Sequence, residues 1–335
     1  MSQLARQLRL SDAIAIGVAS MVGAGVFAVW GPAAAAAGSG LVIGLVLAAF
    51  AAWCNATSSA QAAKVLVVIA LVGIVTALAT GWISPPASAS FEWVATTPYG
   101  VLQSAGLMFF AFAGYARIAT MGEEVIDPER NIRRAIVGAL TITLVLYALI
   151  AWTLVARVGV AALAGSAAPL TLLVGDHLVQ KTILIIGATA ASAGALLGLL
   201  SGIGRTWLAM ARTHDLPGWF NQTSERIKTP HRIELTVAVV LSVMVMLADL
   251  RGAIGFSSFG VLLYYFVANV SAYTQTEPHR HYHRAWQVLG AATCLVLVVT
   301  LPIMSVVIGM IVLGVGVVWR LAKPEPMSTG AEEAA

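Results

Sequence analysis

About ten apolar segments, each close to the roughly 20 residues that a membrane-spanning helix needs, make up most of this chain. Only 10% of its 335 residues are charged, against 59% that are apolar. A soluble domain of this length carries far more charge. The sequence therefore predicts an all-α polytopic membrane protein. The expected spans are approximately 11–36, 40–60, 62–82, 98–122, 133–156, 182–203, 234–250, 254–275, 285–301 and 303–320.

The joins at Gln61 and Pro302 are very short, so each flanking pair can also be read as one long, kinked helix. Basic residues test the count, because they gather in cytoplasmic loops. With ten spans and both termini cytoplasmic, Arg157, Lys181 and Arg251 face outward and Arg117 lies in the membrane. The remaining basic residues then fall on the inner side: Arg6, Arg9, Lys64, Arg130, Arg133, Arg134, Arg205, Arg212, Arg226, Lys228, Arg232, Arg280, Arg284, Arg320 and Lys323.

The N-terminal segment resembles a secretory signal, with Arg6 and Arg9 before an apolar core and small residues at 33–37. Its apolar run is longer than a signal core and further spans follow, so we expect a retained helix. Cys54 and Cys294 both lie in apolar runs, which favours two buried thiols over a disulfide. The net charge of +4 is explained by basic cytoplasmic loops rather than by binding to nucleic acid.

The segment 17–30 is long and apolar, but Gly23 and Gly25 interrupt its middle. Inside a bilayer, irregular backbone persists only where it is buried in protein or lines a cavity. The free N–H groups at the start of a half-helix attract an anion. Alternatively, the two glycines allow close packing of a neighbouring helix.

A second interruption lies around Ala111 to Gly114, in the expected span 98–122. A pair of broken apolar segments points to the substrate site of a secondary transporter. This second motif favours binding over simple close packing for Gly23 and Gly25.

Three stretches of the chain match a known family. They are Gly23-Ala-Gly-Val-Phe27, then Phe109-Phe-Ala-Phe-Ala-Gly-Tyr115 with Glu123-Glu-Val-Ile-Asp-Pro-Glu-Arg-Asn131, and Arg205-Thr-Trp-Leu-Ala-Met-Ala-Arg212 with Leu216-Pro217 and Thr229-Pro230-His231. Through them the chain resembles permeases of the amino acid, polyamine and organocation superfamily. The resemblance implies two inverted five-helix repeats plus two extra helices, with broken first and sixth helices that hold the substrate.

The chain departs from the family near Gln61. Relatives carry two more helices between a segment like Asn55-Ala-Thr-Ser-Ser-Ala-Gln61 and one like Lys64-Val-Leu-Val-Val-Ile-Ala-Leu71, which here join directly. The resemblance thus implies a single permease domain over 1–335 with an incomplete first repeat that lacks the third and fourth helices. Its expected parts are a cytoplasmic N-terminus (1–10), a partial first repeat (11–82), a second repeat (98–275), two peripheral helices (285–320) and a disordered cytoplasmic tail (321–335).

The resemblance also implies a site for a zwitterion such as an amino acid. Backbone N–H groups at the first break would receive a carboxylate, and carbonyls of Phe110, Ala111 and Ala113 would receive an ammonium. Apolar surroundings strengthen both contacts. The resemblance makes Phe110 the better candidate for a gate, although each of the two rings, Phe110 and Phe112, can equally be a packing residue. The expected binding residues are Val22, Gly23, Ala24, Gly25, Val26, Phe110, Ala111, Phe112, Ala113 and Gly114.

Four charged residues are candidates for coupling or gating. Arg117 is either a counter-ion for the substrate or for Glu123 or Glu124, or a side chain that snorkels to the interface. Lys64 resembles a lysine that replaces a sodium ion in proton-coupled or exchanging relatives, and an interfacial lysine is the alternative. Glu123 and Glu124 would join an inner charge network.

The remaining motifs predict structure rather than chemistry. His279, His281 and His283 alternate without a carboxylate or cysteine at ligand spacing, so a basic loop is favoured over a metal site. Asp127-Pro128 predicts a turn, with Asn131 as the cap of the next helix. The chain shows no phosphate-binding loop after a strand and no defensible nucleophile and base pair, so we expect neither an enzyme nor a bound cofactor.

Together these features predict a secondary active transporter of amino acids or related amines in the plasma membrane. It would work by alternating access on a small-molecule substrate, with proton coupling or exchange favoured over sodium coupling, and a homo-oligomer is compatible with it. A shortened, non-transporting relative that acts as an accessory subunit, or an inactive remnant, is the alternative. A channel is disfavoured because a single charge lies within the spans.

Overall fold

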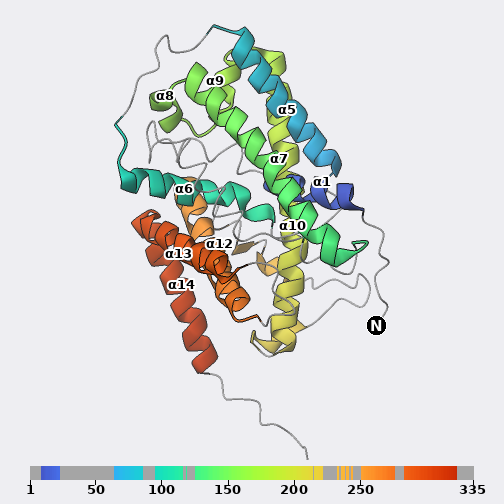
Figure 1. Cartoon of the computed structure of the whole chain (residues 1–335), viewed down its shortest axis with the longest axis vertical. Helices are drawn as coiled ribbons and strands as arrows, with labels where there is room; N and C mark the ends of the chain where they lie inside the picture. Colours follow the sequence, from blue (N-terminus) through green and yellow to red (C-terminus); the bar gives the residue numbers. More distant parts are fainter. Residues whose placement is uncertain are drawn as a thin grey trace, which may run out of the picture.

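The computed structural model describes residues 9–22, 64–85, 95–115, 118, 125–213, 215–221, 250–275 and 283–322, with a few residues between 232 and 243. The regular elements in these ranges are helices, as the apolar pattern predicts (Figure 1). The long ones are α1 (Leu10–Met21), α5 (Lys64–Ile83), α6 (Pro98–Phe112), α7 (Pro128–Arg157), α10 (Leu178–Arg212), α12 (Leu250–Tyr273), α13 (Arg284–Thr300) and α14 (Ile303–Leu321). Two short helices, α8 (Val160–Ala164) and α9 (Thr171–Val174), and the 3₁₀ turn η4 (Gly218–Asn221) complete the set.

The expected spans agree with these helices in position and differ in length. Helices α7 and α10 extend beyond the expected 133–156 and 182–203 at both ends, because amphipathic turns continue them past the apolar core. The helix at the expected span 98–122 is shorter than expected, since α6 ends at Phe112. The span 40–60 and most of 234–250 lie outside the described residues.

Two helix boundaries follow from proline chemistry. Helix α6 begins with Pro98 after Thr97, whose hydroxyl accepts a hydrogen bond from the Gly100 N–H at 3.0 Å. At the other join, Leu301 is extended with φ −61° and ψ 161°, and Pro302 precedes the first turn of α14. The chain around Pro302 therefore forms two helices and not one kinked helix.

The start of α7 corrects the expected cap. Helix α7 begins at Pro128 after Asp127, which has a left-handed backbone with φ 48°. Asn131 already lies in the first turn, and its side-chain amide donates to the Ile126 carbonyl at 2.7 Å. Asn131 thus fastens the turn that precedes the helix instead of capping it, because proline sets the earlier start.

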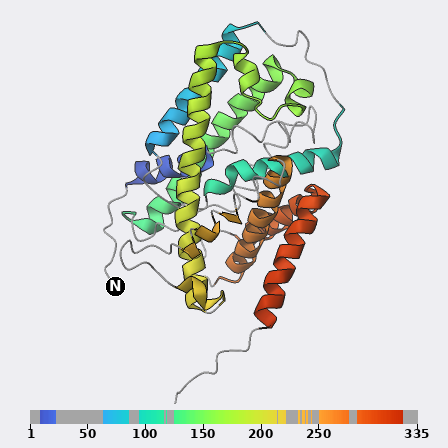
Figure 2. The same cartoon turned by 180° about the vertical axis from the view of Figure 1, so that it is seen from behind.

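The helices pack in two closely joined pairs and a third group (Figures 1 and 2). Helix α5 lies along α10, where Gly73 and Gly187 bring the two backbones together. Helix α1 lies on α7, where a Cβ at Gly17 would be 2.7 Å from the Ala139 Cβ. Helix α12 packs against α6, α13 and α14. Small residues allow such close approach between helices in a membrane.

Three described helices are long and apolar enough to cross a membrane, namely Pro128–Arg157, Arg251–Tyr273 and Ile303–Leu321. Val68–Ile83, Leu178–Ser192 and Arg284–Thr300 are shorter apolar helices within the described residues. Many large aliphatic side chains on these helices are exposed, including Val299 at 73% and Leu321 at 80%. Such a surface suits contact with lipid.

Candidate functional site

The C-terminal end of α1, just before the first expected break, lies against the second expected break at the end of α6. Helix α1 ends at Met21 and α6 ends at Phe112, after which residues 113–115 form a 3₁₀ turn. A Cβ at Gly114 would overlap the Ser20 carbonyl and lie 2.7 Å from the Met21 nitrogen. Only glycine fits at this crossing, because the opposing atoms belong to backbone.

A tyrosine from α7 joins the two helix ends. The Tyr147 hydroxyl lies 2.7 Å from the Met21 carbonyl oxygen and 2.9 Å from the Ala111 carbonyl oxygen. A hydroxyl carries one proton, so Tyr147 shares a single donor between the two acceptors. Tyr147, Met21 and Ala111 are all buried, so this polar contact fixes the geometry of the junction.

Aromatic rings surround the junction. Phe112 packs edge-on against Tyr147 with ring centroids 5.0 Å apart, and Tyr115 stacks on Tyr265 of α12 at 5.2 Å. The Tyr265 hydroxyl also lies 3.4 Å from the Ala113 carbonyl oxygen. The rings make the surroundings apolar, which strengthens electrostatic contacts at the carbonyl groups of the junction.

The junction attracts positive charge. The C-terminal ends of α1 and α6 meet there, and the end of a helix carries a partial negative charge. The carbonyls of Met21, Ala111 and Ala113 belong to these ends, and each carbonyl oxygen has a second lone pair beyond its contact with a tyrosine. The described half of the junction therefore suits an ammonium group rather than a carboxylate.

A further hydroxyl lies one helical turn from Tyr147. Thr143 Oγ1 is buried and has no hydrogen-bond partner within the described part of the chain. Residues four apart share one face of a helix, so Thr143 and Tyr147 project from the same side of α7. A buried hydroxyl without a partner is costly, and a ligand or a water molecule relieves that cost.

The sequence-predicted binding residues divide between the described and undescribed parts of the chain. Gly114 and the carbonyl of Ala111 lie at the junction, Phe112 is fully buried and Phe110 is partly buried. The Val22 N–H donates to the Val18 carbonyl at 2.7 Å, so it continues α1. Gly23, Ala24, Gly25, Val26, Arg117, Glu123 and Glu124 lie outside the described residues, and Lys64 begins α5 with its side chain also outside them.

Sequence reasoning missed Tyr147, Thr143 and Tyr265. Their signal is weak, because a tyrosine or threonine in an apolar helix usually packs or bonds to its own backbone. The register of α7 against α1 and α6 gives Tyr147 its role. No group of three metal-ligating side chains occurs among the described residues.

A bundle of apolar helices, several of them long enough to cross a membrane, defines the class of multi-pass membrane proteins. The profile of the amino acid permease family matches residues 58–322. The chain belongs to this family of transporters, and it is not an enzyme.

Individual relatives agree with the family. The chain is 39% identical over 398 aligned positions to an uncharacterized transporter of Mycobacterium tuberculosis, which covers 94% of this chain and 90% of the relative. A vacuolar cationic amino acid transporter of Arabidopsis thaliana is 29% identical over 203 positions, or 59% of this chain and 33% of the relative. A methylthioribose transporter of Bacillus subtilis is 26% identical over 251 positions, or 71% of this chain and 53% of the relative.

The length of the mycobacterial alignment bears on the two helices that this chain is expected to lack. The 398 aligned positions outnumber the 335 residues of the chain, so the mycobacterial relative has residues with no counterpart here. The surplus is large enough for two membrane-spanning helices of roughly 20 residues each. The family match also begins at residue 58, beside the short join at Gln61.

Proposed function

We propose that this chain is a secondary active transporter of amino acids or related amines that works by alternating access. The observation that carries the proposal is the meeting of the α1 and α6 ends at Tyr147, where backbone carbonyls collect in a buried, apolar setting. An ammonium group satisfies such carbonyls better than a neutral group does, since charge-assisted hydrogen bonds are the stronger ones.

The carboxylate of the substrate would bind at the first break. There the residues Gly23 to Val26 would offer backbone N–H groups to it, with glycine allowing close approach. The distance between the two ends of the substrate is then fixed by the two breaks. The names of the plant relatives support a cationic amino acid, and that of the Bacillus relative supports a wider range of substrates.

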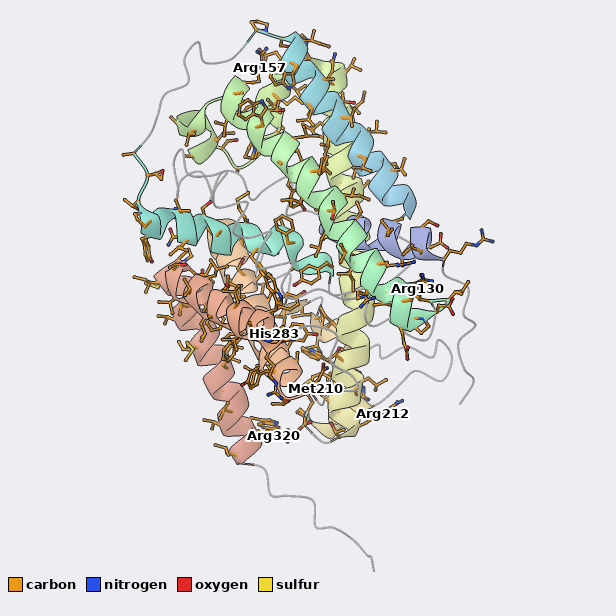
Figure 3. The ribbon with its side chains drawn as sticks, viewed as in Figure 1. Arg130, Arg157, Met210, Arg212, His283 and Arg320 are labelled. Carbon is orange, nitrogen blue, oxygen red and sulfur yellow. The ribbon has the colours of Figure 1, made fainter. Side chains whose placement is uncertain are left out.

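In the proposed topology, ten helices span the cell membrane and both termini lie in the cytoplasm. Arg157 lies at one end of the molecule, and Arg212 and Arg320 lie at the other, as Figure 3 shows. Because basic residues favour the cytoplasmic side, we place Arg212 and Arg320 inside and the α5 and α7 C-termini outside. The first repeat would lack its third and fourth helices, in line with the longer alignment.

Coupling to protons or exchange of substrates is proposed in place of sodium coupling. Lys64 at the start of α5, with Arg117, Glu123 and Glu124, would provide the charges that respond to a proton or to a second substrate. An ammonium that loses its solvation changes its proton affinity readily. The short first repeat favours one alternative, a non-transporting relative that binds the substrate as an accessory subunit.

The test is uptake of labelled amino acids by proteoliposomes, with and without an inward proton gradient. We expect saturable uptake that an unlabelled amine inhibits by competition. An N-acetylated amino acid should not inhibit it, because acetylation removes the ammonium charge. Substitution of Gly25 by leucine should abolish binding without changing insertion. Folded protein that binds amino acids without transporting them would favour the accessory subunit, and absence of binding would overturn the proposal.

A further inference from the structure

The end of the molecule around Arg157 is fastened by one side chain. Arg157, in the last turn of α7, donates from Nε to the Gly81 carbonyl at 2.6 Å and from Nη2 to both the Ser84 and Trp82 carbonyls. These carbonyls lie at the C-terminal end of α5, where the last carbonyls of a helix have no hydrogen-bond partner within the helix. Arg157 therefore caps the end of α5 from α7.

A second contact one turn earlier strengthens the link. The guanidinium of Arg157 lies 5.2 Å from the centre of the Trp82 ring, and the Trp82 indole N–H donates to Thr153 Oγ1 at 3.2 Å. Thr153 and Arg157 are four residues apart and share one face of α7. Both residues hold the last turn of α5.

The segment before α10 closes the same end. Ser84 Oγ lies 3.5 Å from Nε2 of His177, the residue before α10, and a Cβ at Gly81 would be 2.8 Å from Leu173 in α9. Arg157, Ser84, His177 and Val174 line a cavity of about 240 Å³ between these elements. The cavity is partly open to solvent, and Gly81, Ser84 and Arg157 themselves contribute to its lining.

The two helices that Arg157 joins belong to different pairs. Helix α5 packs along α10 and α7 along α1, whereas α5 touches α7 over far less of its length. The Gly73 and Gly187 backbones that join α5 to α10 leave no room between them. By contrast, Trp82 is 52% exposed and the hydrogen bond from Arg157 to its carbonyl is exposed, while those to Gly81 and Ser84 are part-buried, so water reaches one side of the contact and can replace its hydrogen bonds when they break.

We propose that Arg157, with Trp82 and Thr153, forms a releasable latch that closes this end of the molecule by holding the α5–α10 pair against the α1–α7 pair. The latch rests on the proposed function, in which the two pairs separate and rejoin during alternating access and this end faces the outside. Opening would carry the C-terminal end of α7 away from α5 and α9 and bring water to the buried side chains that line the cavity. The latch is a positioning device and does not touch the substrate.

The test is the labelling rate of a buried reporter cysteine by a water-soluble maleimide, in full-length protein whose two native cysteines are replaced by alanine. Val174→Cys is the reporter, because Val174 is 1% exposed and lines the cavity. Val160→Cys is the matched control, because Val160 is also a buried valine at 6% exposed, in neighbouring α8, and does not line the cavity. Neither measurement requires a transported substrate.

Arg157→Gln should raise labelling at position 174 about tenfold, the effect of losing charge-assisted hydrogen bonds on an opening equilibrium, and leave position 160 unchanged. Arg157→Lys should give an intermediate rate, since one ammonium cannot bridge several carbonyls. An unchanged rate at 174, or an equal rise at 160, would overturn the latch. If uptake fails while the labelling response is present, the proposed function falls and the latch stays.

Discussion

The junction of α1, α6 and α7 and the peripheral helix α14 are both apolar stretches of one chain, yet they are built in opposite ways. At the junction, Gly114 leaves no room for a side chain and Tyr147 is fully buried. Of the 19 residues of α14, only Ser305 and Gly309 are buried. Apolar composition therefore brings a helix into the bilayer, and close packing decides whether protein or lipid covers it.

Gly114→Ala should show the largest difference between the two regions. The added methyl group meets the Ser20 and Met21 backbone, which cannot move without displacing α1, so we expect a loss of about 3 kcal/mol or more. Gly314→Ala in α14 meets no described atom within 4 Å and should leave stability unchanged or slightly raised. Thermal unfolding in detergent measures both. Equal stability of the two variants would refute a tight junction.

Tyr147→Phe should have the next largest effect. The change removes the shared proton donor and leaves the buried Met21 and Ala111 carbonyls without it, at a cost of about 2 kcal/mol. Substrate affinity should fall as well, because the two helix ends lose their common contact. Tyr264→Phe is the control, since Tyr264 is 63% exposed. Parent-like stability and affinity in Tyr147→Phe would show that the rings alone hold the junction.

Gly309→Ala tests a place where α14 packs closely on α12. A Cβ there would overlap the buried Phe259 ring of α12, which is a side chain and can shift more readily than backbone, so a loss of about 1 kcal/mol is expected. The effect should lie between those of Gly114→Ala and Gly314→Ala in the same unfolding assay. A loss as large as that of Gly114→Ala would mean that α14 is part of the rigid core.

Asp215→Asn should have the smallest effect. Arg320 at the end of α14 pairs with the Asp215 carboxylate, and the Trp319 indole donates to the Asp215 backbone carbonyl at 3.1 Å. The Arg320 side chain is 75% exposed, and exposed ion pairs contribute less than about 1 kcal/mol. We expect a loss of about 0.5 kcal/mol that disappears in high salt. A larger loss that persists in salt would identify a structural anchor for α14.

Much of the fold was predictable because the periodicity and length of an apolar segment are local properties of the sequence. The apolar runs located α5, α7, α10, α12, α13 and α14, and the break near Ala111 to Gly114 falls where α6 ends. Cys294 is buried as expected. The ends of helices were less predictable, since Pro128 starts α7 before Asn131 and the turns beyond the apolar core lengthen α10.

Roles that depend on contacts between distant residues were not predictable. Tyr147 lies 126 residues from Met21 in the chain, and Arg157 lies 76 residues from Gly81, so no local pattern connects them. Phe110 stood out in the sequence, but the fully buried ring that packs on Tyr147 is Phe112. Only the rotation of α6 against α7 distinguishes these two rings.

The sequence by itself determined that this chain is helical, that it lies in a membrane and that α6 breaks near Ala111, and its motifs indicated the permease family. The first three follow from the bilayer, which forces every apolar segment to satisfy its own backbone and confines irregular backbone to buried places. The tertiary structure decided that the α1 and α6 ends share one tyrosine, and that Arg157 closes the end of α5. Such contacts depend on how helices far apart in the chain rotate and approach each other, and packing of small residues sets that geometry.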